Sequence, residues 1–184
     1  MDYLMETKRL RLRKLTKEDV APLYEILSDA EVMQYYPAPY TLDGVKDWIG
    51  RSMDSYQKNG FGLWAVILKE SGDFIGQCGI SLQNIDGAYV PEIGYHIHKW
   101  YWNQGYATEA AKASLAYGFQ NLGLESIFIH TYIKNSPAQR IAEKVGMKKV
   151  KEYDKHFNAH NLIWRLVVYE MTQKESMSTS YETS

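Results

Sequence analysis

The apolar residues near the N-terminus follow two different periods. Residues 9–13 alternate strictly between arginine and leucine, which is the pattern of a strand that turns its leucines toward a core. Residues 20–27 carry apolar side chains at helical spacing, and Thr16 with Asp19 forms an approximate capping box just before them. The pattern predicts a strand followed by an amphipathic helix, with the arginines solvated on the outer face of the strand.

Proline and glycine mark the next boundaries. Pro37 and Pro39 exclude a regular helix, so residues 33–40 are predicted to form an aromatic loop. Thr41 then caps a second helix, whose apolar side chains share one face until the Asn-Gly pair at 59–60 ends it. Two helices therefore precede the main run of strands.

The middle of the chain predicts three antiparallel strands in sequence. Residues 61–68 form an apolar run without helical period, and residues 74–82 follow a turn signal as its hairpin partner. A second turn at residues 84–87 leads into a strand over residues 93–98, which mixes aromatic, β-branched and polar side chains. Connections this short favour antiparallel pairing.

A long helical pattern follows this strand. Apolar residues fall at helical spacing from residue 106 to residue 122, and Gly123 is placed to end a helix there. The next strand, residues 126–133, is joined to the previous one through this helix, so the two should be parallel in a right-handed unit. If these strands splay apart, they leave a cleft that a cofactor could fill.

The C-terminal third predicts one more helix and a final strand pair. Ser136 suits the helix N-cap, Pro137 the first helical position, and Gly146 the stop. Residues 147–153 and 162–170 then form the hairpin that closes the sheet. The fold class predicted from these elements is α+β, with mixed α/β order.

Composition adds limits to this picture. The chain has 184 residues, is 45% hydrophobic and carries a formal net charge of −1, which fits a single domain over residues 1–171. Residues 172–184 are rich in Ser, Thr, Glu and Lys, and we expect a disordered tail. The near-neutral charge argues against a nucleic-acid partner. No apolar run approaches ~18 residues, so we expect a cytoplasmic protein without a membrane partner.

The junction between the strand at 93–98 and the helix from 106 is the first candidate site. A strand that passes through a glycine-bearing turn into a helix presents free backbone N–H groups where partial positive charge collects. Such a junction suits a phosphate or pyrophosphate. Neither the P-loop pattern nor the Gly-x-Gly-x-x-Gly fingerprint of dinucleotide sites is present, so both of those nucleotide sites become minor alternatives.

Two longer strings carry a family resemblance. The first is Glu92-Ile93-Gly94-Tyr95 followed by Tyr101-Trp102-Asn103-Gln104-Gly105-Tyr106-Ala107-Thr108-Glu109-Ala110. The second is residues 135–147, with Asn135, Glu143, Lys144 and Gly146 at the matching positions. The chain resembles the GNAT superfamily of N-acetyltransferases, and within it the branch of Rim-type N-terminal acetyltransferases of ribosomal proteins. The resemblance implies a central, mostly antiparallel twisted sheet with a splayed parallel strand pair and flanking helices.

The resemblance also implies where acetyl-CoA binds. Its pyrophosphate would lie on the loop amides, and its pantetheine on free backbone groups of the central strand near Ile97. The implied cofactor-binding residues are Ile97, Asn103, Gln104, Gly105, Tyr106, Ala107, Thr108, Asn135 and Lys144. Three positions depart from the family pattern: Trp102 stands where Gln or Arg is usual, Ala138 replaces a Ser, and Ala142 replaces a Tyr that protonates the CoA thiolate.

Catalysis of amine acetylation needs a group that removes the ammonium proton. Glu92 is the first candidate, because the family carries a carboxylate here, although a Glu that only fixes a neighbouring loop is an equal alternative. His96 and His98 are the second candidates. They could also hold a metal, but no third ligand accompanies them, so no metal is expected. His130 is expected to be structural, and Cys78, alone in an apolar run, is expected to be a buried, inert thiol.

The implied function is direct transfer of an acetyl group from acetyl-CoA to an amine, either the α-amine of a protein N-terminus or a small molecule. The loops at 33–40 and 154–161 are the candidate walls of the acceptor site. A non-catalytic CoA-binding module on the same scaffold is the alternative, which the alanines at 138 and 142 keep open. The protein is expected to be a monomer or a homodimer.

Overall fold

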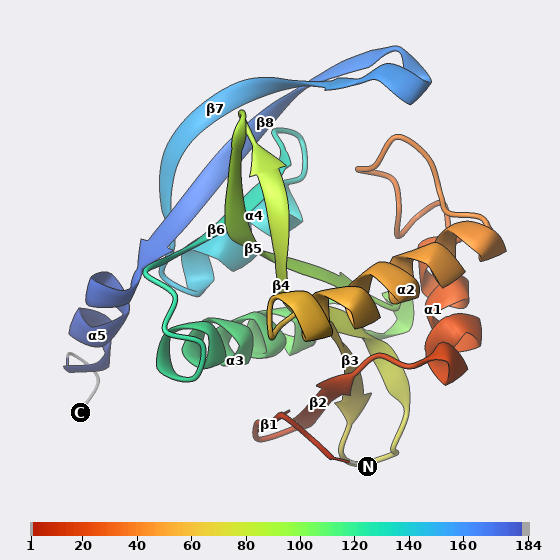
Figure 1. The fold of residues 1–184 in the computed structure, drawn as a ribbon, viewed down its shortest axis with the longest axis horizontal. Helices are drawn as coiled ribbons and strands as arrows, with labels where there is room; N and C mark the ends of the chain where they lie inside the picture. The colour runs from red at the N-terminus through yellow and green to blue at the C-terminus, as the bar shows by residue number, and fades with distance from the viewer. Residues whose placement is uncertain (1, 182–184) are drawn as a thin grey trace.

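Eight strands form one sheet in the computed structural model, which describes residues 2–181 (Figure 1). They are β1 (Met5–Glu6), β2 (Leu10–Lys14), β3 (Leu63–Leu68), β4 (Phe74–Ile85), β5 (Ala88–Ile97), β6 (Ser126–Tyr132), β7 (Lys148–Phe157) and β8 (Leu162–Thr172). Their order is β1-β2-β3-β4-β5-β6-β8-β7. β5 and β6 are parallel, and the other neighbouring pairs are antiparallel. The predicted mixed sheet is confirmed.

Helices cover both faces of this sheet. They are α1 (Val20–Leu27), α2 (Leu42–Lys58), α3 (Tyr106–Gln120), α4 (Ser136–Lys144) and α5 (Gln173–Tyr181). Along β3, side chains at odd positions pack with α1 and α2, and those at even positions pack with α3 and α4. Because successive strand residues point to opposite faces, the two helix pairs lie on opposite sides of the sheet. Within the described residues, no helix is long and apolar enough to span a membrane.

The predicted elements of the N-terminal third are confirmed, but the arginines of β2 are not simply solvated. Arg13 makes two contacts of 2.7 and 2.8 Å to the carboxylate of Asp19, and only 12% and 5% of these two side chains is exposed. Arg9 reaches Glu109 on α3. Alternation along a strand places these side chains on one face, but it does not show which distant carboxylates pack there.

The hairpin of β4 and β5 is longer than the sequence indicated. Ile85 and Ala88 pair at its end, and Asp86 and Gly87 between them both have positive φ, at 53° and 87°. Positive φ at both central residues is the geometry of a type I′ turn. The hairpin therefore extends over the second half of the sheet, where Ile85 packs in a third apolar cluster with side chains of β7 and β8.

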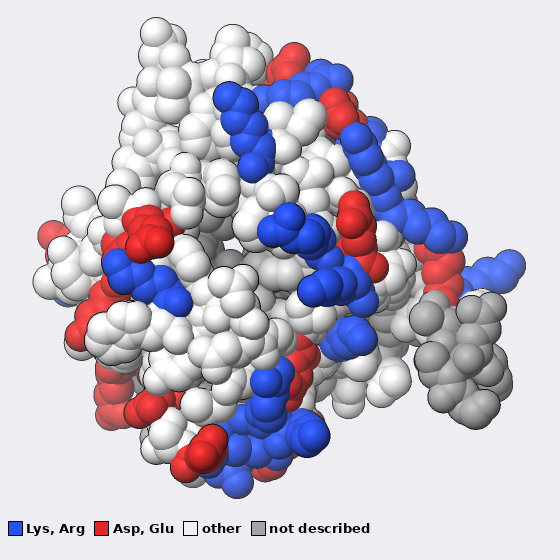
Figure 2. Space-filling view, turned by 180° about the vertical axis from the view of Figure 1, so that it is seen from behind, with Lys and Arg blue, Asp and Glu red and all other residues white. Residues whose placement is uncertain are grey.

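Most basic side chains along β7 and β8 are paired with acidic ones, while Lys155 lies over the ring of Phe157. Figure 2 shows lysines and arginines on this side of the molecule with acidic side chains among them. The pairs are Lys148–Glu175, Lys149–Glu152, Lys151–Asp86, Arg165–Glu152 and Arg165–Asp154. The positive charge of this edge is therefore compensated within the protein.

The cap of α4 differs from the prediction. Asn135, not Ser136, is the N-cap, and its Oδ1 accepts a hydrogen bond of 3.1 Å from the backbone N–H of Ala138. Pro137 lies in the first turn, as predicted. Asn and Ser are equally good N-caps, so two adjacent candidates cannot be ranked by residue type alone.

The C-terminal segment also differs from the prediction. The sequence predicts disorder from residue 172, but residues Gln173–Tyr181 form α5, and residues 182–184 lie outside the described part of the chain. Thr172 and Glu175 exchange hydrogen bonds in the manner of a capping box. Gln173 donates from its side chain to the carbonyl of Phe119, and from its backbone to that of Glu125. These contacts stabilise a helix that composition alone disfavours.

Truncation after Thr172 is expected to lower the free energy of unfolding by about 1–2 kcal/mol, because it removes the hydrogen bonds of Gln173 and Glu175. Truncation after Met177 is the matched control, since it keeps both residues. Urea unfolding of the two truncated proteins measures the difference. Equal stability of both with the full chain would mean that α5 contributes nothing to the fold.

Candidate functional site

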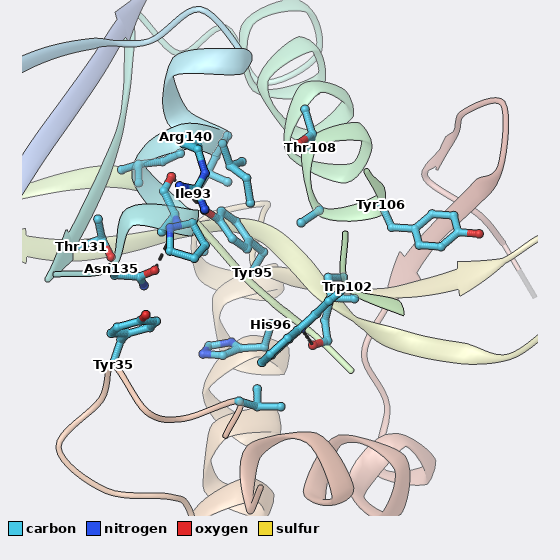
Figure 3. A pocket seen from close by; sticks show the side chains of 18 of the residues that line it. Tyr35, Ile93, Tyr95, His96, Trp102, Tyr106, Thr108, Thr131, Asn135 and Arg140 are labelled. Carbon is cyan, nitrogen blue, oxygen red and sulfur yellow. Dashed lines mark hydrogen bonds between the residues drawn. The ribbon is translucent and has the colours of Figure 1, made fainter. Parts of the chain in front are cut away.

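A cleft of about 480 Å³ opens where β5 and β6 separate. The two strands share a single paired position, Glu92 with Phe128, and diverge beyond it. Side chains from β5, β6, the first turn of α3, α4 and the segment 32–36 line the cleft (Figure 3). The predicted splayed parallel pair therefore exists, and it leaves backbone groups on the edge of β5 without a strand partner beyond Glu92.

The turn before α3 has the geometry of an anion site. Gly105 is the N-cap, in the left-handed region with φ of 81°, and Asn103 also has positive φ. The first helical hydrogen bond runs from the N–H of Glu109 to the carbonyl of Gly105. The N–H groups of residues 106–108 therefore have no helical partner, and all three residues line the cleft. These donors, together with the helix dipole, suit a phosphate.

An arginine far away in sequence holds this turn in place. Arg9 donates to the carbonyl of Gln104 at 2.8 Å and pairs with Glu109 at 2.7 Å, while its guanidinium lies 4.3 Å from the ring centre of Tyr106. Thr7 donates to the same carboxylate at 2.6 Å. Partial burial opposes ionisation of Glu109, but these hydrogen bonds lower its pKa overall. Sequence reasoning missed Arg9, because the contact joins positions a hundred residues apart.

Two cations stand one turn apart on α4 at the rim of the cleft. They are Lys144, which the sequence predicted, and Arg140, which it did not. Both are exposed, and neither is paired with a carboxylate among residues 2–178. Asn135 also lines the cleft. Its side-chain oxygen Oδ1 caps α4, so within the side-chain amide only the NH₂ group is free for a ligand. This rim can hold further negative charge.

Ile97, Gln104 and Tyr106, which were predicted to bind the cofactor, contribute to the cleft in different ways. Ile97 lines the cleft, and its carbonyl accepts a hydrogen bond of 2.8 Å from the indole of Trp102. The side chain of Gln104 instead reaches the carbonyl of Trp100 and does not line the cleft, although its peptide belongs to the turn. Tyr106 contributes backbone only, because its ring points away from the cleft (Figure 3).

His98 does not belong to the cleft. It caps the short 3-10 helix η2 (Lys99–Tyr101), where its Nδ1 accepts from the N–H of Trp100 at 3.3 Å. Because His98 does not line the cleft, the structure does not support the prediction that it removes a proton from the substrate. In the part of the chain that the structure describes, no group of three His, Cys, Asp or Glu side chains is arranged to hold a metal.

Glu92 lies in the cleft beside an imidazole that sequence reasoning set aside. Its Oε1 is 2.9 Å from Nδ1 of His130, and the backbone N–H of His130 donates to the same oxygen at 3.4 Å. Both side chains are nearly buried and both line the cleft. On β6, His130 lies two residues after Phe128, the residue that is paired with Glu92. This register brings the side chains of Glu92 and His130 together. The contact is close but is not aligned as a hydrogen bond, so the carboxylate acts on the ring through its negative charge and favours an imidazole that accepts a proton.

His96 lines the cleft on the same face of β5. Its side chain is buried, and burial lowers its pKa to about 4. The imidazole is therefore neutral at physiological pH. Figure 3 shows its ring nitrogens on the side of the cleft where Tyr35 lies.

The tyrosine that the family pattern places at position 142 is absent, but another phenol lies in the cleft. Ala142 is fully buried in the core and is not among the residues that line the cleft. Tyr95 lines the cleft, and its hydroxyl lies 3.4 Å from the carbonyl of Ala138 on α4. Burial raises the pKa of Tyr95 well above its usual value, so the phenol stays protonated and remains a hydrogen-bond donor.

Cys78 is a core residue, as predicted. It is buried with its Sγ 3.4 Å from the hydroxyl of Ser114, and burial raises the pKa of the thiol to about 12.

We therefore expect Cys78→Ala to leave turnover within about twofold of wild type, because a thiolate nucleophile is absent at neutral pH. Steady-state kcat measures this. A large loss would indicate a covalent acetyl-enzyme.

Comparison with known proteins agrees with this geometry. Residues 9–148 match the family model of an acetyltransferase (GNAT) domain. The chain is 35% identical over 153 residues to the uncharacterized protein YkkB of Bacillus subtilis (strain 168), covering 81% of this chain and 89% of YkkB. It is 32% identical over 171 residues to YnaD, an uncharacterized N-acetyltransferase of the same organism, covering 92% and 96%. A crystal structure of a GNAT-family acetyltransferase from Bacillus anthracis superposes with a TM-score of 0.78 at 29% identity, covering 93% of this chain and 99% of that one.

Proposed function

Because the chain belongs to the GNAT acetyltransferase family, we propose that it transfers the acetyl group of acetyl-CoA directly to an amine held in the cleft between β5 and β6. The observation that carries the proposal is the cleft itself. It joins a helix N-terminus with free N–H groups to the unpaired edge of a strand, and it ends at a buried carboxylate and imidazole.

The residues present fit acetyl-CoA. The N–H groups of residues 106–108 suit its pyrophosphate, and Arg140 and Lys144 add positive charge at the rim. The free edge of β5 can hydrogen-bond the pantetheine amides, as an added strand would. Bound there, acetyl-CoA supplies an activated thioester, and every other part of the reaction depends on side chains of this chain.

We assign proton removal to Glu92 and His130 together. In the reaction, the amine nitrogen attacks the thioester carbonyl carbon, the carbon–sulfur bond breaks, and the CoA thiolate leaves. The proton of the amine passes to the imidazole of His130, whose positive charge the adjacent carboxylate of Glu92 stabilises. The hydroxyl of Tyr95 can donate a hydrogen bond to the leaving thiolate, and the thiolate takes its proton from water.

The acceptor is an amine whose identity the family does not define. The Rim-type resemblance implies the α-amine of a protein N-terminus, and a small-molecule amine is the alternative. Tyr35 and Tyr36, from the predicted aromatic loop, line the cleft opposite α4 and can form one wall of the acceptor site. The loop predicted at 154–161 is in fact the end of β7 and a short 3-10 turn at Asn158–His160, and none of its residues lines this cleft.

An acceptor screen tests the proposal. Acetyl-CoA is incubated with the protein and a set of N-terminal peptides, amino acid amides and polyamines, and CoA thiol release is measured together with the mass of the product. Acetylation of an amine at a rate proportional to enzyme concentration supports transfer. If acetyl-CoA binds but no amine is acetylated, the result supports the alternative of a non-catalytic CoA-binding module. The alanines at 138 and 142 are the reason for that alternative.

A further inference from the structure

His96 carries a buried ring nitrogen that has no partner. Its side chain is 7% exposed, and Nε2 makes no hydrogen bond within the described residues. The residue lines the acetyl-transfer cleft but is not needed for proton removal, which Glu92 and His130 can perform. A buried polar atom without a partner is unfavourable, so it calls for an explanation in a ligand or a moving part.

A chain of hydrogen bonds determines which nitrogen of His96 holds the proton. The indole N–H of Trp48 donates to Oε1 of Gln77 at 3.0 Å, and Nε2 of Gln77 lies 3.1 Å from Nδ1 of His96. An indole can only donate, so the Gln77 amide must present its oxygen to Trp48 and its NH₂ to His96. Nδ1 is therefore an acceptor, and the hydrogen of the neutral imidazole resides on Nε2.

A side chain from outside the sheet packs against the imidazole of His96. The ring of Tyr36 lies 5.0 Å from the ring of His96, centre to centre, and Tyr36 itself is 39% exposed. Tyr36 belongs to the irregular segment between α1 and α2. Tyr36 is thus a loop side chain that lines the cleft, and an incoming ligand can displace it more readily than it could displace a strand residue.

Glu92, Gly94 and His96 share one face of β5, since successive strand residues alternate. Gly94 lies between the other two and has no side chain, and an added Cβ there would meet only Leu63, at 3.6 Å. The face therefore offers a gap with a proton acceptor at one end and an N–H donor at the other. At about 3.3 Å per residue, these ends are roughly 13 Å apart along the backbone, a span that suits an extended chain of a few residues.

We propose that His96 is a specificity-determining residue whose Nε2–H donates to a carbonyl or carboxylate oxygen of the acceptor, so that the enzyme selects peptide-like amines over plain alkylamines and polyamines. This inference rests on the proposed acetyl transfer and specifies its substrate class. A site built to donate a hydrogen bond discriminates strongly against an analogue without an acceptor, because the buried N–H is then left unpaired. Trp48 and Gln77 act as positioning residues that fix the tautomer.

The first experiment measures the tautomer. Ring ¹⁵N NMR of the CoA-loaded protein, with His96 assigned by comparison with His96→Phe, is expected to show a neutral imidazole protonated at Nε2. Gln77→Glu should invert it, because a carboxylate accepts from both Trp48 and Nδ1–H. Titration with tetra-alanine amide, whose four extended residues match the span, should shift the Nε2 resonance, whereas 1,6-diaminohexane should not. A wild-type ring protonated at Nδ1, or an Nε2 signal unmoved by the peptide amide, overturns the proposal.

The second experiment measures selectivity. The ratio of kcat/KM for tetra-alanine amide to that for 1,6-diaminohexane should exceed about 10 in wild type and fall toward 1 in His96→Phe, which keeps the ring packing but removes the donor. An unchanged ratio in His96→Phe overturns the proposal. If neither amine is acetylated, the proposed transfer fails for these acceptors, and the NMR titration still decides whether Nε2–H binds an oxygen. Where Gln77→Glu does not fold, the wild-type spectrum assigned with His96→Phe still decides the tautomer, and the kinetics of His96→Phe decide the selectivity.

Discussion

Glu92→Gln and His130→Gln are each expected to lower kcat by roughly 10²-fold or more, and the double variant is expected to be little worse than either single one. The physical reason is that the two side chains serve the same proton transfer. The carboxylate oxygen lies 2.9 Å from Nδ1, so its negative charge stabilises the imidazolium that forms when the amine proton arrives. Losing either partner disables the same proton transfer, and the second loss removes nothing further.

Steady-state kinetics with the acceptor found in the screen measure this expectation. Calorimetry should give an unchanged affinity for acetyl-CoA in all three variants, because neither side chain belongs to the turn before α3. Cys78→Ala is the matched control from the buried core. If His130→Gln retains wild-type turnover while Glu92→Gln does not, Glu92 acts alone or through water, as the sequence suggested. If Glu92→Gln is fully active, the pair has no part in proton removal.

The sequence predicted those features that depend on near neighbours in the chain. Thr41 caps α2 through the N–H of Gly44, and Gly105 turns a strand into a helix, because caps and turns depend on a few adjacent residues. The parallel pairing of β5 and β6 also followed, since a long helix between two strands leaves little choice. The same local reasoning could not choose between Asn135 and Ser136, because both are good caps.

The features that the sequence did not predict depend on contacts between distant segments. His130 was expected to be structural, because nothing near it in the chain shows that β6 places it against Glu92. Gln77 and Trp48 come from β4 and α2, and their link to His96 exists only once those elements pack. Arg9 joins the start of β2 to the turn before α3 in the same way. A signal could have come only from paired changes at these positions among related sequences.

Gly105→Val is expected to weaken acetyl-CoA binding by about 30-fold, which corresponds to ~2 kcal/mol. Two effects combine. The backbone of Gly105 has φ of 81°, a region that β-branched residues strongly disfavour, and an added Cβ would lie 3.3 Å from the guanidinium of Arg9. The turn must shift, and the N–H groups of residues 106–108 no longer converge on one point.

Gly72→Val is the control that separates strain from ligand contact. Gly72 has nearly the same φ, 78°, and an added Cβ there meets nothing within 4 Å. It lies in the turn between β3 and β4 and does not line the cleft. We expect both variants to lose thermal stability, since both carry the backbone strain, but only Gly105→Val to lose affinity for acetyl-CoA in calorimetry. Equal affinity in the two variants would remove the phosphate-binding role from the turn at Gly105, and the negative charge of CoA would then have to be held by Arg140 and Lys144 on α4.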